Sequence, residues 1–279
     1  MVDVIVVGVT NAPAARRAVD WAAQRAADRR MVLELLAVVG GAIGAVGEAS
    51  VLDSALAGAH ELVEAEAERV RALGIEVRTR VERGNPVAKL LDAANDAALL
   101  VIGSDYRGPG SGPARGAHGV RIAAGAHCPV VVVPDLDFSG RSGIVVGVDG
   151  SPVSEQAVAF AAAEADRLGE RLIAVSVWTP LEAPGNMGVY PIEYLENMAA
   201  LTEEAQAVAL AGLRQQYPDL EIERRVERGY PSQIINQLAA NARLAVVGSH
   251  GRGALARFLL GSISHEVLAR LATVTAVIR

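Results

Sequence analysis

The segment Val81-Glu82-Arg83-Gly84-Asn85-Pro86 recurs almost unchanged further along the chain as Val226-Glu227-Arg228-Gly229-Tyr230-Pro231. The two segments lie 145 residues apart, and Gly103-Ser104 recurs as Gly248-Ser249 at the same offset. Nearer the start, Val6-Val7-Gly8-Val9 corresponds to Val145-Val146-Gly147-Val148 at an offset of 139 residues. Identical tetrapeptides at nearly constant offsets indicate one small domain that is present twice, head to tail.

Short apolar runs alternate with helical patterns in the same order in each copy. The strands predicted for the first copy are 4–7, 32–38, 75–81, 99–102 and 130–133, and its helices are 14–29, 50–73, 86–97 and 120–125. In the second copy we expect strands at 144–148, 172–177, 222–226, 245–247 and 276–278, with a longer loop at 179–191. Such alternation is typical of an α/β domain with a doubly wound parallel sheet.

The linker composition of Pro134–Gly143 divides the chain into residues 1–138 and 139–279. Each copy ends in an apolar strand, and an uncovered apolar edge strand is an aggregation hazard. We therefore expect the strands Val130–Val133 and Ala276–Ile278 to pair with each other within one chain, and two chains to be able to associate as a homodimer.

Bulk composition excludes several classes of protein. The net charge of −6 and the pI near 5.5 disfavour a nucleic-acid partner. No apolar stretch reaches the ~18 residues of a membrane span, and the start of the chain has no basic region of a signal peptide. Cys128 is the sole cysteine, so no intrachain disulfide forms. The sequence thus favours a soluble, cytoplasmic protein without membrane contacts.

Two glycine-rich loops of the second copy follow its first and fourth predicted strands. One is Gly147–Ser151, and the other begins at Gly248 and continues to the pair Gly261-Ser262. In a doubly wound sheet, ligands bind beyond the carboxyl ends of such strands, where the strand order reverses. Glycines allow backbone N–H groups to converge on an anion, and the start of a helix favours phosphate. Asp149 accepts hydrogen bonds only, which suits ribose hydroxyls or an exocyclic amine.

Other nucleotide and hydrolase motifs are missing. The single lysine, Lys89, has no Walker A glycines around it, and the chain has neither a Rossmann G-x-G-x-x-G nor a G-x-S-x-G nucleophile motif. The five histidines show no zinc-ligand spacing, so no metal ligand is assigned. We expect His250 to be a solvent-exposed loop residue and Cys128 to be a packed structural thiol.

The segment from Gly248 to Ser262 fits the pattern G-x-x-G-x₉-G-[ST], and in this the chain resembles the ATP-binding class of the universal stress protein family. The segments Val146–Ser151 and Ala174–Val177 are also similar to that family, so the resemblance covers nearly the whole chain as a tandem pair. It implies a five-stranded sheet ordered 3-2-1-4-5 in each domain. It also implies bound ATP, accompanied by magnesium or manganese.

The resemblance assigns roles to residues of the second copy. Asp149 and Val177, beside Gly147 and Val148, would lie at the nucleoside end, and Val247 and Gly248 would line the ribose and adenine. The phosphates would contact Gly251, Gly261, Ser262, Ile263 and Ser264. The first copy departs from this pattern at Thr10, Tyr106 and Ala117, so we expect it to bind ATP weakly or not at all.

Two functions remain compatible with such a site. The first is a binding module for stress response in which ATP sets the conformation or a surface for a protein partner. The second is an enzyme that slowly hydrolyses ATP or adenylates a substrate. We identify no general base, no arginine finger and no lysine for the phosphates, and therefore assign no catalytic residue. This favours the binding module.

Overall fold

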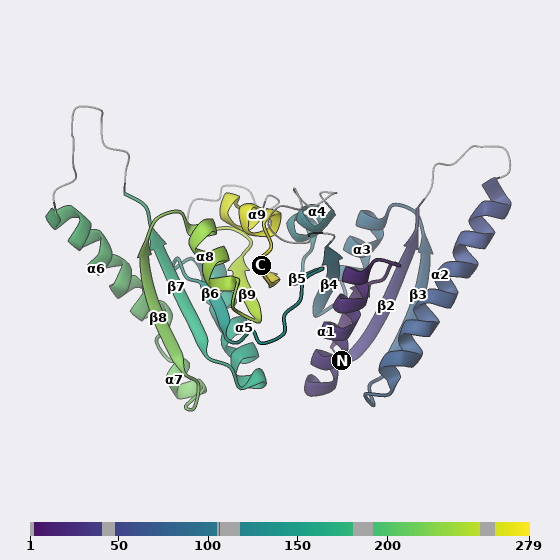
Figure 1. Ribbon diagram of the computed structural model, residues 1–279, viewed down its shortest axis with the longest axis horizontal. Helices are drawn as coiled ribbons and strands as arrows, with labels where there is room; N and C mark the ends of the chain where they lie inside the picture. The colour runs from purple at the N-terminus through teal and green to yellow at the C-terminus, as the bar shows by residue number, and fades with distance from the viewer. Residues whose placement is uncertain (1–2, 41–47, 105, 107–117, 181–191, 252–259) are drawn as a thin grey trace. The chain divides into compact units, whose positions relative to one another are not determined.

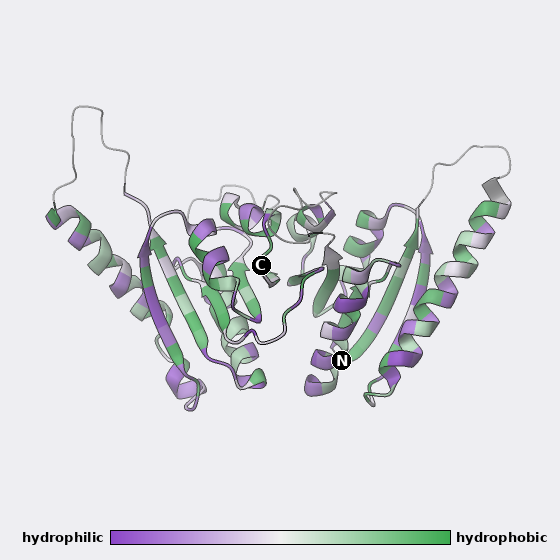
Figure 2. Ribbon diagram, in the orientation of Figure 1, coloured by the Kyte–Doolittle hydropathy of each residue, from purple (hydrophilic) through white to green (hydrophobic). Residues whose placement is uncertain are grey.

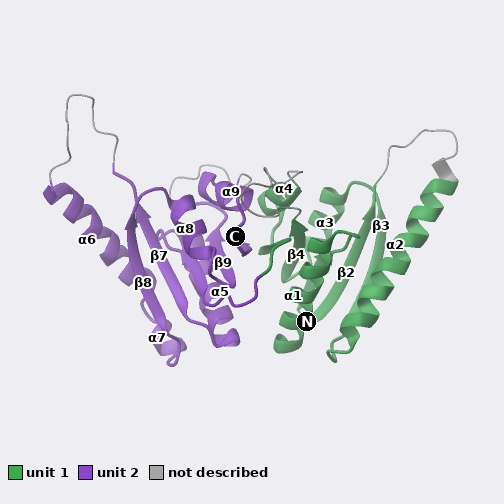
Figure 3. Cartoon of the chain, viewed as in Figure 1, with its two compact units in different colours: residues 1–137 green, residues 138–279 purple. Residues whose placement is uncertain are grey.

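The computed structural model describes residues 3–40, 48–104, 106, 118–180, 192–251 and 260–279, and every structural statement below concerns these residues. The chain forms two compact units, Met1–Asp137 and Phe138–Arg279 (Figure 3). Within the described residues, no helix is long and apolar enough to cross a membrane.

Unit 1 alternates strands and helices along the chain (Figure 1). Its elements are β1 (Val4–Gly8), α1 (Pro13–Arg29), β2 (Val32–Val39), α2 (Glu48–Arg71), β3 (Val77–Arg83), α3 (Pro86–Ala94), β4 (Leu99–Ser104), α4 (His118–Gly125) and β5 (Val130–Pro134). The strands are parallel and ordered β3-β2-β1-β4-β5.

Unit 2 repeats this arrangement. Its elements are β6 (Ile144–Gly147), α5 (Pro152–Leu168), β7 (Leu172–Trp178), α6 (Ile192–Ala209), the short α7 (Leu213–Gln216), β8 (Ile222–Arg228), α8 (Pro231–Ala239), β9 (Leu244–Gly248), α9 (Ser262–Ala269) and β10 (Val274–Ile278). The parallel order β8-β7-β6-β9-β10 is again 3-2-1-4-5. The predicted fold class is therefore confirmed in both halves.

The amino-acid composition of each strand matches its position in the sheet. The first and fourth strands of each unit, such as β1 and β9, lie inside the sheet and are almost wholly apolar. The outer strands β3 and β8 are rich in Arg and Glu and are mostly half-buried. Their charged residues appear purple in Figure 2. Charged edge strands resist pairing with other chains. Helices cover both faces of the unit 1 sheet, where α1 contacts α2 and α3 contacts α4.

Several helix and strand ends in unit 1 differ from the prediction by up to three residues, and the end of α2 shows a physical reason. Helix α2 ends at Arg71 rather than at residue 73, because the N–H of Gly74 bonds to the carbonyl of Arg71 at 2.9 Å and Gly74 has φ 74°. Strand β3 consequently begins at Val77, two residues later than predicted. The loop predicted at 179–191 falls mostly outside the described residues, as do Gly108–Pro113 and Ala117.

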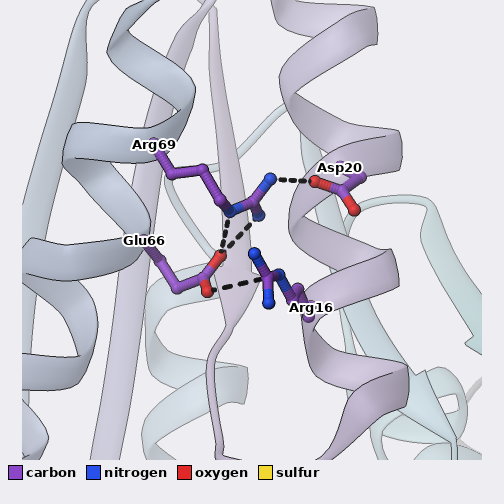
Figure 4. Close-up of polar contacts among 4 residues, drawn as sticks. All are labelled: Arg16, Asp20, Glu66 and Arg69. Atoms are coloured by element: carbon purple, nitrogen blue, oxygen red, sulfur yellow. Dashed lines mark hydrogen bonds and ion pairs between the residues drawn. The ribbon is translucent and has the colours of Figure 1, made fainter.

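An ion-pair network joins α1 to α2 (Figure 4). Arg69 on α2 bonds to Asp20 and to Glu66, and the Nε of Arg16 lies 3.8 Å from Oε1 of Glu66. Burial acts to lower the pKa of Arg69, but the bonds from Glu66 and Asp20 outweigh it and raise the pKa. Because the Asp20 and Arg16 side chains are more than half exposed, the network orients the two helices and contributes little to stability.

Candidate functional site

The turn after β6 is fixed by three hydrogen bonds among its own residues. The N–H of Ser151 donates to Oδ1 of Asp149 at 2.8 Å, and the N–H of Asp149 donates to Oγ of Ser154 at 3.1 Å. The N–H of Ser154 donates to Oγ of Ser151, the N-cap of α5, at 3.2 Å. Gly150 occupies the left-handed region with φ 75°, which glycine adopts without strain. The closed set of bonds holds the Asp149 carboxylate in one place.

The loop after β9 is drawn back against the start of α9. The N–H of Gly261 donates to the carbonyl of Ser249 at 2.7 Å, and the N–H of Ser249 donates to the carbonyl of Ile278 at 2.6 Å. The hydroxyl of Ser264, a residue only 3% exposed, donates to the carbonyl of Gly248. The end of β9 and the first turn of α9 are thus held together from both sides.

The first turn of α9 presents backbone donors rather than side chains. Gly261 is the N-cap and has no side chain to accept from the first-turn N–H groups, which therefore remain available to an anion. Ser262 begins the helix with an exposed side chain. We expected the Ser264 hydroxyl to add a donor for phosphate, but its bond to Gly248 uses that proton.

At three loop positions glycine is required because a Cβ would come too close to a neighbouring atom, and not because the backbone adopts a left-handed φ. A Cβ on Gly251 would lie 2.5 Å from Oδ2 of Asp149, and a Cβ on Gly248 would lie 3.0 Å from Cγ1 of Val153. A Cβ on Gly261 would lie 3.2 Å from the carbonyl oxygen of Ser249. None of the three adopts a left-handed φ, so the backbone-bending role that the sequence suggested does not explain them. Their role is to let the two loops touch.

A pocket of about 120 Å³ lies where these loops meet. Nine of the eleven predicted site residues line it: Gly147, Val148, Asp149, Val177, Val247, Gly248, Gly251, Ile263 and Ser264. Gly261 and Ser262 lie beside it in the chain but are not among its lining residues.

Five lining residues were absent from the prediction: Ser154, Val175, Pro231, Ile235 and His250. Ser154 could have been found from its position three residues after the N-cap Ser151, the spacing of a capping bond. Ile235 lies one helical turn after Pro231 on α8, so the two share a face. His250 is half-buried in the lining with its Nδ1 at 2.9 Å from Oγ of Ser249, which contradicts the expectation of a solvent-exposed loop residue.

The equivalent turn of unit 1 lacks these features. Positions 149, 151 and 154 of unit 2 correspond to Thr10, Ala12 and Ala15, and the N-cap Ala12 has no side-chain bond. Only the bond from the N–H of Ala12 to Oγ1 of Thr10 at 3.3 Å persists. Tyr106, which replaces the second loop glycine, is 7% exposed.

The space between the first helix and the fourth strand is also smaller in unit 1. A Cβ built on Gly103 would lie 2.6 Å from the backbone carbonyl carbon of Ala14. In unit 2 the equivalent distance, from Gly248 to the carbonyl carbon of Val153, is 3.6 Å. The first helix of unit 1 therefore lies about 1 Å closer to the end of the fourth strand at this point.

Metal-binding side chains do not gather in either unit. Among the residues that the structure describes, no group of three or more His, Cys, Asp or Glu side chains could hold a metal ion.

Comparison with known sequences points to one family. The profile of the Universal stress protein family matches residues 1–134 and again residues 141–279. A universal stress protein of Mycobacterium tuberculosis is 33% identical over 282 residues, covering 96% of this chain and 93% of that protein. One from Mycolicibacterium smegmatis is 33% identical over 288 residues, covering 99% and 96%. Another from M. tuberculosis is 36% identical over 201 residues, which is 70% of this chain and 66% of that protein. The chain therefore spans just under two thirds of the length of this last relative.

Solved structures agree on the fold. A universal stress protein from Archaeoglobus fulgidus superposes with a TM-score of 0.67 at 17% identity, covering 99% of this chain and 95% of that one. A putative universal stress protein from Pseudomonas aeruginosa gives a TM-score of 0.64 at 17% identity, covering 99% and 92%.

Proposed function

The chain belongs to the universal stress protein family as a tandem two-domain member, and from this premise we propose that its second unit binds ATP and acts as a nucleotide-dependent regulatory module in stress response. One observation carries the proposal. The carboxylate of Asp149 and the backbone of Gly251 come together so closely that no Cβ fits between them, and a pocket opens beside them.

The pocket has apolar lining residues that suit a nucleobase and polar groups that suit the ribose and the phosphates. Its apolar lining comes from β-branched side chains at the ends of β6, β7 and β9 and from α8, and such a surface suits a nucleobase. Asp149, held by Ser151, can accept from ribose hydroxyls. The uncapped N–H groups at the start of α9 favour phosphate oxygens, and magnesium or manganese would reduce the phosphate charge.

Binding is favoured over catalysis by the side chains that line the pocket. Of the lining residues, only Asp149 and His250 carry an acidic or basic side chain, and no lysine or arginine is present to stabilise a reacting phosphate. Oδ1 of Asp149 accepts from the Ser151 N–H, and Nδ1 of His250 is bonded to Ser249. Each group therefore has one polar atom engaged in its own loop. Slow hydrolysis of ATP or adenylation of a substrate is the alternative function, and a turnover assay on the same preparation distinguishes it.

We propose one nucleotide per chain. Unit 1 has lost the hydroxyls and the carboxylate of the turn, and its first helix lies closer to the fourth strand. The module would therefore consist of one binding unit and one structural unit.

Calorimetric titration of the nucleotide-free protein with ATP tests this proposal. We expect a stoichiometry near one and loss of binding in Gly261→Glu. The matched control is Gly116→Glu, at the position of the first copy that corresponds to Gly261 at the offset of 145 residues, and it should bind as wild type does. A carboxylate at position 261 would repel phosphate, and a loss of ~3–4 kcal/mol takes a micromolar site out of measurable range. A stoichiometry near two, or retained affinity in Gly261→Glu, would contradict the proposal.

A further inference from the structure

Aromatic residues are rare in this chain, yet two of them adjoin pocket-lining residues of unit 2 in the sequence. Only 4% of the residues are Phe, Trp or Tyr. Trp178 directly follows the lining residue Val177, and Tyr230 directly precedes the lining residue Pro231. In unit 1 the equivalent positions hold Val39 and Asn85, neither of which is aromatic.

The equivalence of these positions is structural. Val39 pairs with Arg83 across β2 and β3, and Trp178 pairs with Arg228 across β7 and β8. In both units the glycine that follows the arginine donates its N–H, at 3.0 Å, to the carbonyl at the end of the neighbouring strand. The same turn therefore precedes Asn85 in one unit and Tyr230 in the other.

Asn85 has a clear structural role that Tyr230 does not reproduce. Oδ1 of Asn85 accepts from the N–H of Ala88 at 3.1 Å and caps α3. Tyr230 is the N-cap of α8 and makes no side-chain capping bond, and its side chain is 65% exposed. Unit 2 thus carries a large ring in solvent at a position where a capping side chain would stabilise the helix. Folding of unit 2 does not account for this residue.

The turn that carries Tyr230 is held in place directly before a residue that lines the pocket. Oγ1 of Thr179 donates to the carbonyl of Gly229 at 2.6 Å, and the Arg228 guanidinium lies 5.8 Å from the centre of the Trp178 ring. Pro231, immediately after Tyr230, contributes to the pocket lining together with Ile235. A fixed backbone with an unrestrained ring is an arrangement that lets the ring turn onto a bound ligand.

We infer that Tyr230 is a specificity residue of the ATP site, with its ring stacked on the nucleobase at the apolar side of the pocket. This inference rests on the proposed ATP binding and adds the group that distinguishes a nucleotide from a bare polyphosphate. Aromatic side chains stack on any base, because every base has a π-face. The residue therefore increases affinity for the nucleobase and leaves the phosphate contacts at α9 unaffected.

The test compares wild type, Tyr230→Phe and Tyr230→Asn in the full chain, each titrated with ATP and with tripolyphosphate. The asparagine variant takes its residue from the first copy and can cap α8, so we expect it to be at least as stable as wild type in thermal unfolding. Tyr230→Asn should bind ATP about tenfold more weakly and tripolyphosphate equally well, and Tyr230→Phe should bind both as wild type does.

Each of the other results overturns the inference. If Tyr230→Asn binds ATP as tightly as wild type, the ring does not contact the base, although the proposed function stands. If it loses affinity for ATP and for tripolyphosphate alike, the residue acts on the loop and not on the base. If wild type itself does not bind ATP, the proposed function fails and the specificity role fails with it.

Discussion

Replacing Gly251 by alanine tests the contact on which the site depends. The new Cβ would lie 2.5 Å from Oδ2 of Asp149, well inside van der Waals contact. The carboxylate cannot simply rotate away, because its other oxygen accepts from Ser151 and the Asp149 N–H is bonded to Ser154. One of the two loops must therefore move.

The magnitude follows from the separate terms. Insertion of a methyl group into a packed contact costs about 1–3 kcal/mol of unfolding free energy. In Asp149→Ala the clashing oxygen is absent, at the cost of about 1 kcal/mol for the lost bond to Ser151. Gly251→Ala should then cost little in the Asp149→Ala background. We expect the double variant to be about 1–2 kcal/mol more stable than the sum of the two single effects predicts.

Urea unfolding monitored by tryptophan fluorescence measures this coupling. The chain has one tryptophan in each unit, Trp21 on α1 and Trp178 on β7, so Trp21→Phe leaves a reporter for unit 2 alone. Separate reporters are needed because a two-unit chain is not assumed to unfold in one step. If the effects of the two substitutions add to within about 0.5 kcal/mol, the Asp149–Gly251 contact is not the reason for glycine, and the reasoning is wrong.

Three further predictions follow from other contacts. Gly103→Ala should lower the unfolding free energy of unit 1 by about 3 kcal/mol, because the new Cβ would lie 2.6 Å from the backbone of Ala14. Gly8→Ala should lower it by less than about 1.5 kcal/mol, because its Cβ would meet only a leucine methyl group at 3.3 Å. Equal losses for the two variants in urea unfolding would contradict this. Burial raises the pKa of the Cys128 thiol to about 11, so native protein should resist thiol reagents at pH 8. Because the folded state holds that proton more tightly, its contribution of about 2–3 kcal/mol is present below pH 9 and is lost as the pH rises through 11, and Cys128→Ala should remove this pH dependence. Finally, we propose from the sequence that the last strands of the two copies pair, so a fragment of residues 141–279 should self-associate in sedimentation experiments; a stable monomer that binds ATP would refute the pairing.

The doubly wound parallel sheet could be predicted from the sequence because local signals and packing agree, whereas its strand order was implied by the family resemblance. The repeated segment ending in Gly84 and Gly229 is a clear example, since both glycines adopt φ values of 136° and 151° that other residues rarely accept. A turn that needs glycine at the end of the third strand fixes the alignment of the two copies. Apolar runs on either side then give the strands their places inside the sheet.

The site could be predicted where its residues belong to a motif of fixed spacing, and the family resemblance added Val177 from a separate strand. Asp149 and the loop glycines form a pattern with fixed spacing, and most of them line the pocket. Ile235 and Val175 enter it from separate elements, and their apolar character is the same as that of any core residue. The reason for Gly251 was equally hidden, because the residue that excludes a Cβ there lies about a hundred positions away.

The two copies show why a site can disappear while its fold persists. The apolar core depends on the strands, and Ala15 fills its buried place as well as Ser154 does, at 3% exposure each. The hydroxyls and the carboxylate of unit 2 hold the turn after β6 and join the start of α9 to the end of β9, and they do not hold strands in the sheet. In unit 1, where the residues of this turn are replaced, the backbone of Ala14 lies about 1 Å closer to a Cβ built on Gly103 than the backbone of Val153 lies to a Cβ built on Gly248. The two units therefore differ here in backbone as well as in side chains. We expect that aspartate and serine restored at positions 10 and 15 would supply the missing groups without creating an ATP site in unit 1.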